Sequence, residues 1–194
     1  AGLDLCRVNV FTCAATRADA GGNLEEAIEN IDIVGPTMLR AAGKNYGFTA
    51  GVSEPAEYSK VTEMMKSEGG ISRVASLELA RKVFNHTAAY DAMISNYLND
   101  QAEDRFPERL TLTYEKAQSL RYGENPHQNA CYYRPALDVA KDQHLELPGI
   151  NQLQGKELSY NNLLDFNAAL RAVLSLPQPG AVIVKHLNPC GVAT

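Results

Sequence analysis

Residues 99–109, NDQAEDRFPER, interrupt the chain and constrain its fold more than any other feature. The segment is rich in charged and amide side chains, contains a proline and follows a long amphipathic pattern over 72–98. Such a composition is typical of a solvent-exposed linker that is not part of a hydrophobic core. A chain of 194 residues can hold one large domain or parts of two. The linker favours two regions, 1–98 and 110–194.

The composition excludes several classes of protein. Eighteen Lys and Arg against 23 Asp and Glu give a net charge of -5, the wrong sign for neutralising a nucleic-acid backbone. No window approaches the roughly 18 consecutive apolar residues that a membrane span needs. The cysteines share no CxxC spacing, so we expect no metal site, no disulfide framework and reduced thiols in the cytoplasm. They are Cys6, Cys13, Cys131 and Cys190.

The first region alternates strand and helix patterns, which is typical of an α/β layer structure. The segment 3–11 predicts a buried strand that ends near Asn9, and 48–52 predicts a second strand. Helices are expected over 23–31 with Asn23 as N-cap, from Pro36 to Lys44 after a break at Gly35–Pro36, over 54–67 and over 72–98. The last two helices are expected to bury Tyr58, Val61 and Met65, and Leu77, Ala80, Phe84, Ala88, Ile94 and Leu98, respectively.

The second region combines short strands with polar loops. Strands are predicted over 110–114 and 130–134, and a buried strand over 181–184. Polar loops are predicted over 121–128 and 153–162. A helix that follows the second loop is expected to bury Leu163, Phe166, Leu170 and Val173.

Lys185 and His186 stand at the end of the predicted buried strand. Parallel α/β sheets bind ligands outside the carboxyl ends of their strands, so this pair is a candidate site. The alternative is a charged pair that simply caps the strand. Neighbouring strand residues point to opposite faces, so the two side chains can share a cleft only if the strand has ended, as Asn188–Pro189 indicates.

The two polar loops carry further candidates with the same ambiguity. Arg121 offers a planar fork for a carboxylate or phosphate, and Tyr122 offers a flat face with a polar tip. Lys156 and Asn162 could face a ligand or water. Each loop alone is more typical of a solvated turn, but several polar loops beside strands of one region favour a binding site.

Several long motifs resemble one family. LRYGENPHQ, GKELSYNNLLDFNAA and VKHLNPCG are similar to signature stretches of the bifunctional purine-biosynthesis enzymes that join AICAR formyltransferase to IMP cyclohydrolase. NLEEAIENIDIVGPTMLRAAGKN and FNHTAAYDAMISNYL resemble the cyclohydrolase half. The similarity runs in order over almost the whole chain, and the abrupt ends lead us to expect an internal fragment.

The resemblance implies a fold for each region and an assembly. Residues 1–98 would be the C-terminal part of the IMP cyclohydrolase domain, a parallel-sheet domain similar to methylglyoxal synthase. Residues 99–109 would be the linker. Residues 110–194 would begin the AICAR formyltransferase domain, an α/β domain similar to cytidine deaminase. A homodimer is also implied.

For the second region the resemblance implies formyl transfer from the co-substrate 10-formyltetrahydrofolate to AICAR, giving FAICAR. The AICAR amine is a poor nucleophile, so a base must take its proton and a cation must meet the oxyanion of the intermediate. The resemblance assigns the base to His186 and the stabilising cation to Lys185. It assigns AICAR contacts to Arg121, Tyr122 and Asn162.

For the first region the resemblance implies closure of FAICAR to IMP, with no metal. It assigns proton transfer to Lys44 and ligand contacts to Asn9, Asp32 and Ile33. Twelve helical residues would separate Asp32 from Lys44 by about 18 Å, so the two can cooperate only if Gly35–Pro36 turns the chain. The alternative is that each complements a helix dipole.

Two positions depart from the family pattern. Phe11 stands where relatives usually have Tyr, and Val34 replaces the first glycine of a Gly-Gly pair. Both changes lie beside residues assigned to ring closure. The alternative to an enzyme is therefore a non-catalytic nucleotide-binding or dimerisation module.

Overall fold

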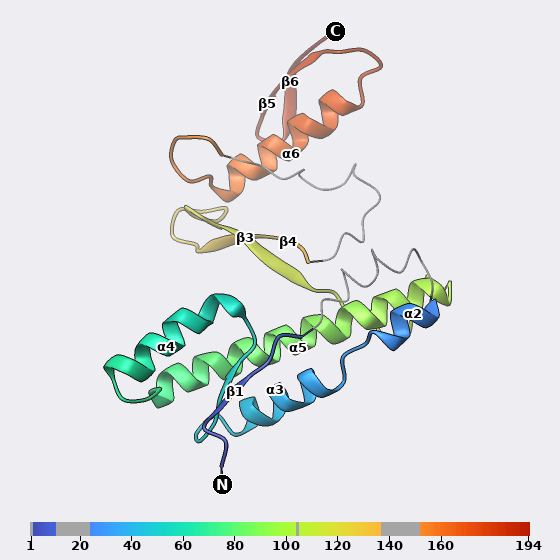
Figure 1. Ribbon diagram of the computed structural model, residues 1–194. Helices are drawn as coiled ribbons and strands as arrows, with labels where there is room; N and C mark the ends of the chain where they lie inside the picture. Colours follow the sequence, from blue (N-terminus) through green and yellow to red (C-terminus); the bar gives the residue numbers. More distant parts are fainter. Residues whose placement is uncertain (1, 11–23, 104, 137–151) are drawn as a thin grey trace. The chain divides into compact units, whose positions relative to one another are not determined.

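The computed structural model describes residues 2–10, 24–103, 105–136 and 152–194. The chain divides into two compact units, Ala1–Leu112 and Thr113–Thr194, which we call unit 1 and unit 2 (Figure 1). The last helix of unit 1 continues to Gln101, through the first part of the segment expected as a linker. The assignment of each unit to one enzymatic half stays a prediction.

In the part of unit 1 that the structure describes, α-helices pack on a short parallel strand pair. In chain order it contains β1 (Leu5–Arg7), α2 (Leu24–Glu29), α3 (Val34–Lys44), β2 (Ala50–Val52), the 3-10 turn η1 (Pro55–Glu57), α4 (Tyr58–Ser67) and α5 (Arg73–Gln101). β1 pairs with β2 in parallel, with Leu5 opposite Ala50. The order of strands and helices expected for the first region is confirmed in the described residues, while Asn23, the expected N-cap, lies outside them. The buried strand expected over 3–11 is limited to Leu5–Arg7, and only Cys6 of it is buried, so its expected burial was wrong.

The core of unit 1 forms where α3 and α5 pack on β2. Leu39 of α3, Val52 of β2 and Val83 of α5 are fully buried. Gly51 makes this close approach possible, because a Cβ there would lie 3.2 Å from both the Ala42 Cβ and the Val83 Cγ2 atoms. The two helices therefore fix the only parallel strand pair found in the described part of the chain.

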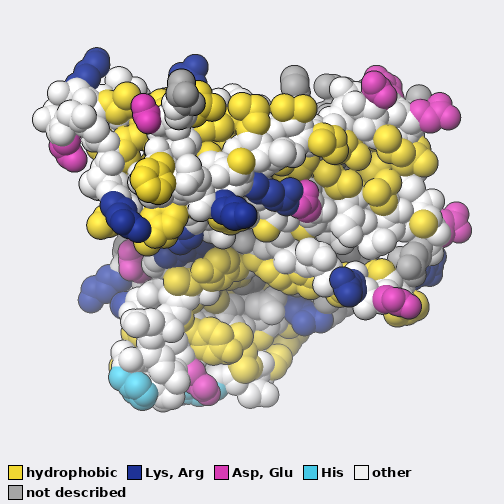
Figure 2. Space-filling model, turned by 90° about the horizontal axis from the view of Figure 1, so that it is seen from below, with side chains coloured by type: hydrophobic (Ala, Val, Ile, Leu, Met, Phe, Trp, Pro, Cys, Tyr) yellow, Lys and Arg dark blue, Asp and Glu magenta, His cyan; other side chains and the backbone are white. Residues whose placement is uncertain are grey.

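The buried face of α5 differs from the predicted one. Ala80 and Val61 are buried as predicted. The other expectations were wrong for the exposed side chains of Met65, Leu77, Phe84, Ala88 and Leu98. The buried residues of α5 are Ser76, Leu79, Ala80, Val83, Thr87, Tyr90, Ala92 and Tyr97. The buried face of α5 includes the small polar residues Ser76 and Thr87. Because the prediction followed the spacing of apolar residues alone, it selected an adjacent face of the helix. Hydrophobic side chains are accordingly visible at the surface (Figure 2).

Within residues 113–136 and 152–194, unit 2 contains two antiparallel hairpins and one helix. Its elements are β3 (Tyr114–Leu120), β4 (Ala130–Pro135), α6 (Tyr160–Leu174), β5 (Ala181–Lys185) and β6 (Asn188–Ala193). β3 pairs with β4, and β5 pairs with β6. The strand expected over 110–114 begins only at Tyr114, because the preceding alternating residues make no strand pairing.

The expectation of a buried strand over 181–184 was wrong. β5 forms an antiparallel hairpin with β6, and alternate β5 residues are exposed, with Ile183 at 68%. A short apolar run fits both a doubly covered strand and a one-sided hairpin strand, so periodicity could not separate them. Among the helices of the described ranges, none is both long and apolar enough to cross a membrane.

Candidate functional site

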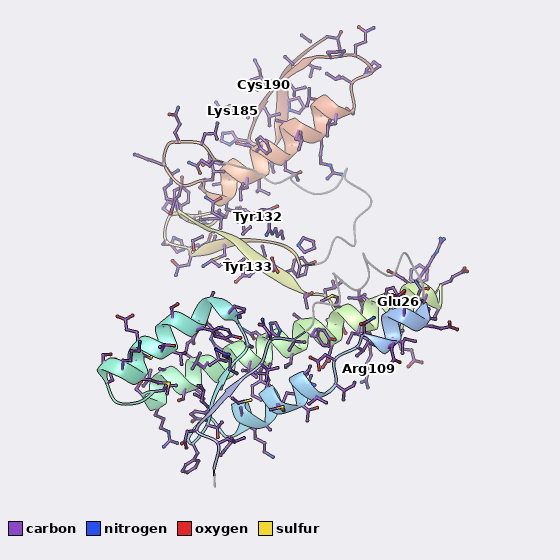
Figure 3. The ribbon with its side chains drawn as sticks, viewed as in Figure 1. Glu26, Arg109, Tyr132, Tyr133, Lys185 and Cys190 are labelled. Carbon is purple, nitrogen blue, oxygen red and sulfur yellow. The ribbon has the colours of Figure 1, made fainter. Side chains whose placement is uncertain are left out.

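Lys185 and His186 lie at the turn of the β5–β6 hairpin, not at the carboxyl end of a parallel strand. Lys185 pairs with Asn188, which leaves His186 and Leu187 as a two-residue turn. Both turn residues have positive φ, 50° and 66°. The Lys185 and His186 side chains are exposed. In Figure 3, Lys185 marks β5 and Cys190 marks β6 of this hairpin.

The turn is held by two side chains. The Leu187 N–H donates to Asp165 Oδ1 of α6 at 2.8 Å. The Asn188 amide donates to the His186 carbonyl oxygen at 2.8 Å. One partner comes from the hairpin and the other from the neighbouring helix, so the turn has a fixed place on α6.

Arg121 and Tyr122 form a stacked pair at the end of β3. The guanidinium carbon of Arg121 lies 4.9 Å from the Tyr122 ring centroid, within cation–π range. Arg121 Nη2 also donates to the Tyr122 hydroxyl oxygen at 3.3 Å. The bond from Arg121, with a further one from Ser159, lowers the pKa of the Tyr122 hydroxyl from its ordinary value of 10.0. The pair presents a cation and an aromatic face together.

The loop after β3 attaches to the start of α6 through backbone hydrogen bonds. Arg121 N–H donates to the Leu158 carbonyl at 3.0 Å, and Tyr160 N–H donates to the Tyr122 carbonyl at 3.1 Å. The Asn161 amide donates to the Glu124 carbonyl at 3.0 Å. Arg121 and Tyr122 are thereby fixed at the N-terminus of the same helix that holds the His186 turn.

Asn162 takes part in the N-terminal cap of α6. The buried Ser159 hydroxyl accepts the Asn162 N–H at 3.3 Å, and Asn162 Oδ1 accepts the Ser159 N–H at 3.0 Å. This is a capping box, in which side chains satisfy the free N–H groups of the first turn. The Asn162 oxygen thus serves the helix, and its exposed amide NH2 group is the part able to donate to a ligand.

α6 therefore gathers the candidates of the second region. Its first turn carries Asn162 and supports Arg121 and Tyr122, and Asp165 supports the turn that carries His186. Six residues separate Ser159 from Asp165, which is about 9 Å along a helix axis. Polar groups that the sequence spreads over more than sixty positions share one support.

In unit 1, Asn9, Asp32 and Ile33 lie at one end of the parallel pair. Asn9 follows β1 and is exposed, and Ile33 directly before α3 is 69% exposed. Asp32 is half-buried, and its Oδ1 accepts the Gly35 N–H at 2.8 Å. A Cβ on Gly35 would lie 3.0 Å from Val8 Cγ1, so the start of α3 touches the end of β1.

The start of α3 is also tied to α5. The Asp32 N–H donates to the buried Tyr90 hydroxyl at 2.8 Å. Asp32 is therefore held at two points: its carboxylate by the Gly35 N–H of α3, and its backbone by Tyr90, 58 residues further along the chain.

Lys44 lies at the opposite end of α3. The helix predicted from Pro36 to Lys44 is present and begins two residues earlier, at Val34. Gly35 and Pro36 belong to its first turn and do not bend the chain back, so the condition for cooperation between Asp32 and Lys44 is not met. Pro is tolerated there since a first-turn N–H has no helical partner to lose. The helix spans about 15 Å. The Lys44 side chain is exposed, and its place at the last residue of α3 separates it from Asp32, which precedes the helix.

Sequence reasoning missed two polar residues. Ser53 directly follows β2, is 4% exposed, and its hydroxyl has no hydrogen-bond partner within the described ranges. The sequence signal that could have identified Ser53 is its place as a polar residue directly after a predicted strand. Asp165 lies within an apolar helix pattern, and its bond to Leu187 spans 22 residues, so local sequence held no signal for it.

Val34, one of the two departures from the family pattern, lies at the exposed start of α3. Phe11 lies outside the described residues. Val34 is the first residue of α3 and is 68% exposed. In the ranges that the structure describes, no group of three or more His, Cys, Asp and Glu side chains could hold a metal ion.

Comparisons with known proteins agree with the motifs. A family model described as AICARFT/IMPCHase bienzyme matches residues 42–194. The "Bifunctional purine biosynthesis protein PurH" of Bacillus subtilis is 50% identical over 99% of this chain, which covers 37% of that relative. Proteins of the same name are each 49% identical in Anoxybacillus flavithermus, over 98% of this chain and 36% of the relative, and in Ruminiclostridium cellulolyticum, over 99% and 37%.

The chain thus spans little more than a third of the length of these curated relatives. Among solved structures, one titled "Crystal structure of ForH" aligns with 28% identity and a TM-score of 0.39, covering 49% of this chain and 50% of that one.

Proposed function

The chain belongs to the AICARFT/IMPCHase bienzyme family, and from that premise we propose that it is part of an enzyme for the last two steps of IMP synthesis. Unit 2 would contribute to formyl transfer from 10-formyltetrahydrofolate to AICAR. Unit 1 would contribute to closure of the product FAICAR to IMP. Support comes from the family match and from the grouping of polar candidates on α6.

Formyl transfer requires two functions that Lys185 and His186 can supply. The exocyclic amine of AICAR loses a proton as it attacks the formyl carbon, and an imidazole titrates near the pH at which this must happen. The carbonyl oxygen of the formyl group becomes an oxyanion, which a compact ammonium stabilises. We assign the first function to His186 and the second to Lys185.

Arg121, Tyr122 and Asn162 fit the binding of the AICAR nucleotide. The Arg121 guanidinium can bind a phosphate in a bidentate way, and the Tyr122 ring gives a flat face for the base. The Asn162 amide can donate to a polar group of the ligand. The observation that carries this proposal is that α6 supports both these residues and the His186 turn.

Removal of the imidazole tests the assignment. In the full-length protein, His186→Ala should lower the kcat of formyl transfer about 10²- to 10⁴-fold, because the general base is lost. Ring closure of added FAICAR, followed by IMP absorbance, should be unchanged. His86→Ala, which removes an imidazole from α5 of unit 1, is the matched control and should leave formyl transfer intact.

Loss of both activities in a folded His186→Ala protein would refute separate sites for the two reactions. Full formyl transfer by that variant would refute the role of His186. A parent protein that binds AICAR or FAICAR but converts neither would instead support a non-catalytic nucleotide-binding or dimerisation module.

For ring closure we propose ligand contacts from Asn9, Asp32 and Ile33, which share one end of unit 1. Proton transfer by Lys44 rests on the family resemblance alone, since α3 separates it from Asp32. In the full-length protein, Lys44→Gln should lower ring closure at least tenfold and leave formyl transfer unchanged. Normal ring closure by this variant would remove Lys44 from the mechanism.

The remaining expectations also belong to this proposal. The parallel β1–β2 pair covered by α3 and α5 supports a methylglyoxal-synthase-like domain, and the α/β composition of unit 2 supports a cytidine-deaminase-like domain. A cytoplasmic homodimer that binds AICAR, FAICAR, IMP and folate follows from the family. Sedimentation of the full-length protein would test the dimer.

A further inference from the structure

We propose that Asp165 is a positioning residue for the His186 turn: its carboxylate holds the Leu187 N–H and so fixes where Lys185 and His186 project. The functional part of this inference rests on the proposed formyl transfer. The contact itself is a 2.8 Å hydrogen bond from a turn amide to a half-buried carboxylate on another element.

The turn needs such a support because its backbone is unfavourable. His186 and Leu187 both adopt positive φ, in a two-residue hairpin turn where Asn and Gly are strongly preferred. Leu187 is the clearer outlier of the two, because a bulky aliphatic residue rarely adopts positive φ, whereas His does so more often. Conformations of this kind persist only when the surrounding structure holds them, and they cluster at functional sites.

Three restraints hold the turn, and one of them comes from outside the hairpin. The strand ladder pairs Lys185 with Asn188, and the Asn188 amide binds the His186 carbonyl. These two fix the turn relative to its own strands. The bond from Leu187 to Asp165 fixes it relative to α6, and a charged acceptor makes such a bond stronger than a neutral one.

α6 is a suitable fixed point for a catalytic turn. Its N-terminus is closed by the capping box of Ser159 and Asn162, and the backbone around Arg121 and Tyr122 is bonded to the same end. Asp165 therefore connects the turn to the support of the proposed AICAR contacts. Loss of this connection should change where the imidazole lies and leave the nucleotide contacts in place.

The alternative is that Asp165 only stabilises unit 2. Two replacements separate these roles. Asp165→Asn keeps an oxygen acceptor at the same distance along the side chain, while Asp165→Leu has a similar size and no acceptor. Asn167→Leu is the matched control, because Asn167 lies on α6 and makes no bond to the hairpin in the described residues.

The first measurement is hydrogen exchange of the Leu187 amide, followed by NMR in the 194-residue chain. Asp165→Leu should speed exchange about tenfold, because the N–H loses its acceptor. Asp165→Asn should retain most of the protection, and Asn167→Leu should match the parent. Equal protection in Asp165→Leu and the parent would overturn the proposed contact, whatever the activity.

The second measurement is steady-state formyl transfer in the full-length protein. Asp165→Leu should lower kcat about tenfold to a hundredfold, as expected for a misplaced catalytic group, while the KM for AICAR stays within about threefold. Asp165→Asn should recover most of the kcat. A parallel rise of KM, or an unchanged kcat beside faster exchange, would overturn the positioning role.

Two further results remain decisive. If Asp165→Leu does not fold, Asp165→Ser replaces it, because the Ser oxygen is one bond shorter and falls short of the Leu187 N–H. If the parent protein shows no formyl transfer, the proposed function fails, and the exchange measurement still decides whether Asp165 holds the turn.

Discussion

The two units of the chain are held together by different kinds of interaction. The buried hydrophobic side chains of the described residues all belong to unit 1 except Leu120 and Leu163. Unit 2 relies on hydrogen bonds with defined partners, from the Ser159 cap to the Asp165 bond. Apolar burial is not directional, whereas hydrogen bonds have strict geometry.

This difference bears on where each unit can place functional groups. In unit 1 the candidate residues stand at the margins of a packed core, and Asp32 is set by a helix cap and by Tyr90. In unit 2 the candidate side chains are exposed except the half-buried Tyr122, and hydrogen bonds hold the backbone that carries them. We therefore expect core substitutions to affect the stability of unit 1 most, and small polar substitutions to affect the site geometry of unit 2 most.

The largest effect should follow from a cavity in unit 1. Leu39→Ala removes a fully buried side chain between α3 and its neighbours and should lower the free energy of unfolding by about 2–5 kcal/mol. Urea unfolding measured by circular dichroism would show it. Met38→Ala on the same helix, where the side chain is 45% exposed, should change stability by less than about 1 kcal/mol. Equal effects would contradict a core at this place.

A smaller effect is expected from the cap in unit 2. Ser159→Ala removes the oxygen that accepts the Asn162 N–H and should destabilise α6 by about 1 kcal/mol. Faster hydrogen exchange of the first-turn amides would report it. Ser175→Ala at the other end of α6, where the hydroxyl donates to Ala172 O and is exposed, is the control. If hydrogen exchange of the first-turn amides is the same in Ser159→Ala and the parent, the view that polar contacts hold unit 2 would be contradicted at this cap.

The third prediction concerns pH. The Arg121 guanidinium lowers the pKa of the Tyr122 hydroxyl because it favours the phenolate. A Tyr122 signal followed by NMR should therefore titrate below the ordinary range, and Arg121→Met should raise that pKa. The lowered pKa adds stability only as the pH rises through the Tyr122 pKa of the folded protein, and adds it in full above the ordinary Tyr pKa. This replacement should therefore not change stability at neutral pH through Tyr122. A pKa that does not move would contradict the contact.

The smallest effect is expected at the surface of unit 1. Arg40 and Asp91 form an ion pair between α3 and α5, and both side chains are well exposed. A double-mutant cycle with Arg40→Ala and Asp91→Ala should give a coupling of about 0.2–1 kcal/mol that decreases with added salt. A larger coupling, insensitive to salt, would mean that polar contacts hold unit 1 as they hold unit 2.

Much of the element order could be predicted from sequence. The strand over 48–52 and the helices ending at Ser67 and beginning after Ser72 carry local signals, and Ser72 indeed caps α5 by accepting the Ala75 N–H. The predictions that failed concern which elements pair or pack with one another. The run over 181–184 contains no information about whether β6 or another strand pairs with it, and the buried face of α5 depends on what α3 and β2 present to it.

The sequence predicted which side chains belong to the candidate site, but not how they are arranged in space. Motif resemblance selected Arg121, Tyr122, Asn162, Lys185 and His186, and the structure places their supports on one helix. α6 supports these residues through backbone hydrogen bonds, such as the one from the Arg121 N–H to the Leu158 carbonyl. Backbone bonds of this kind can form whatever the side chains are, so the sequence carries no signal for them. The helix start near Gly35–Pro36 was predicted to within two residues, because Pro is typical of the first turn of a helix.

The strand pairings also imply an order of folding events. β5 and β6 are joined by a two-residue turn, so this hairpin can form within about 1–10 μs of chain collapse. β1 and β2 pair across 45 residues, Leu5 with Ala50, so their contact must first overcome the entropy of closing a long loop. Unit 1 is therefore the slower half to acquire its topology, and conditions that trap the chain early should yield a formed hairpin beside an unpaired β1.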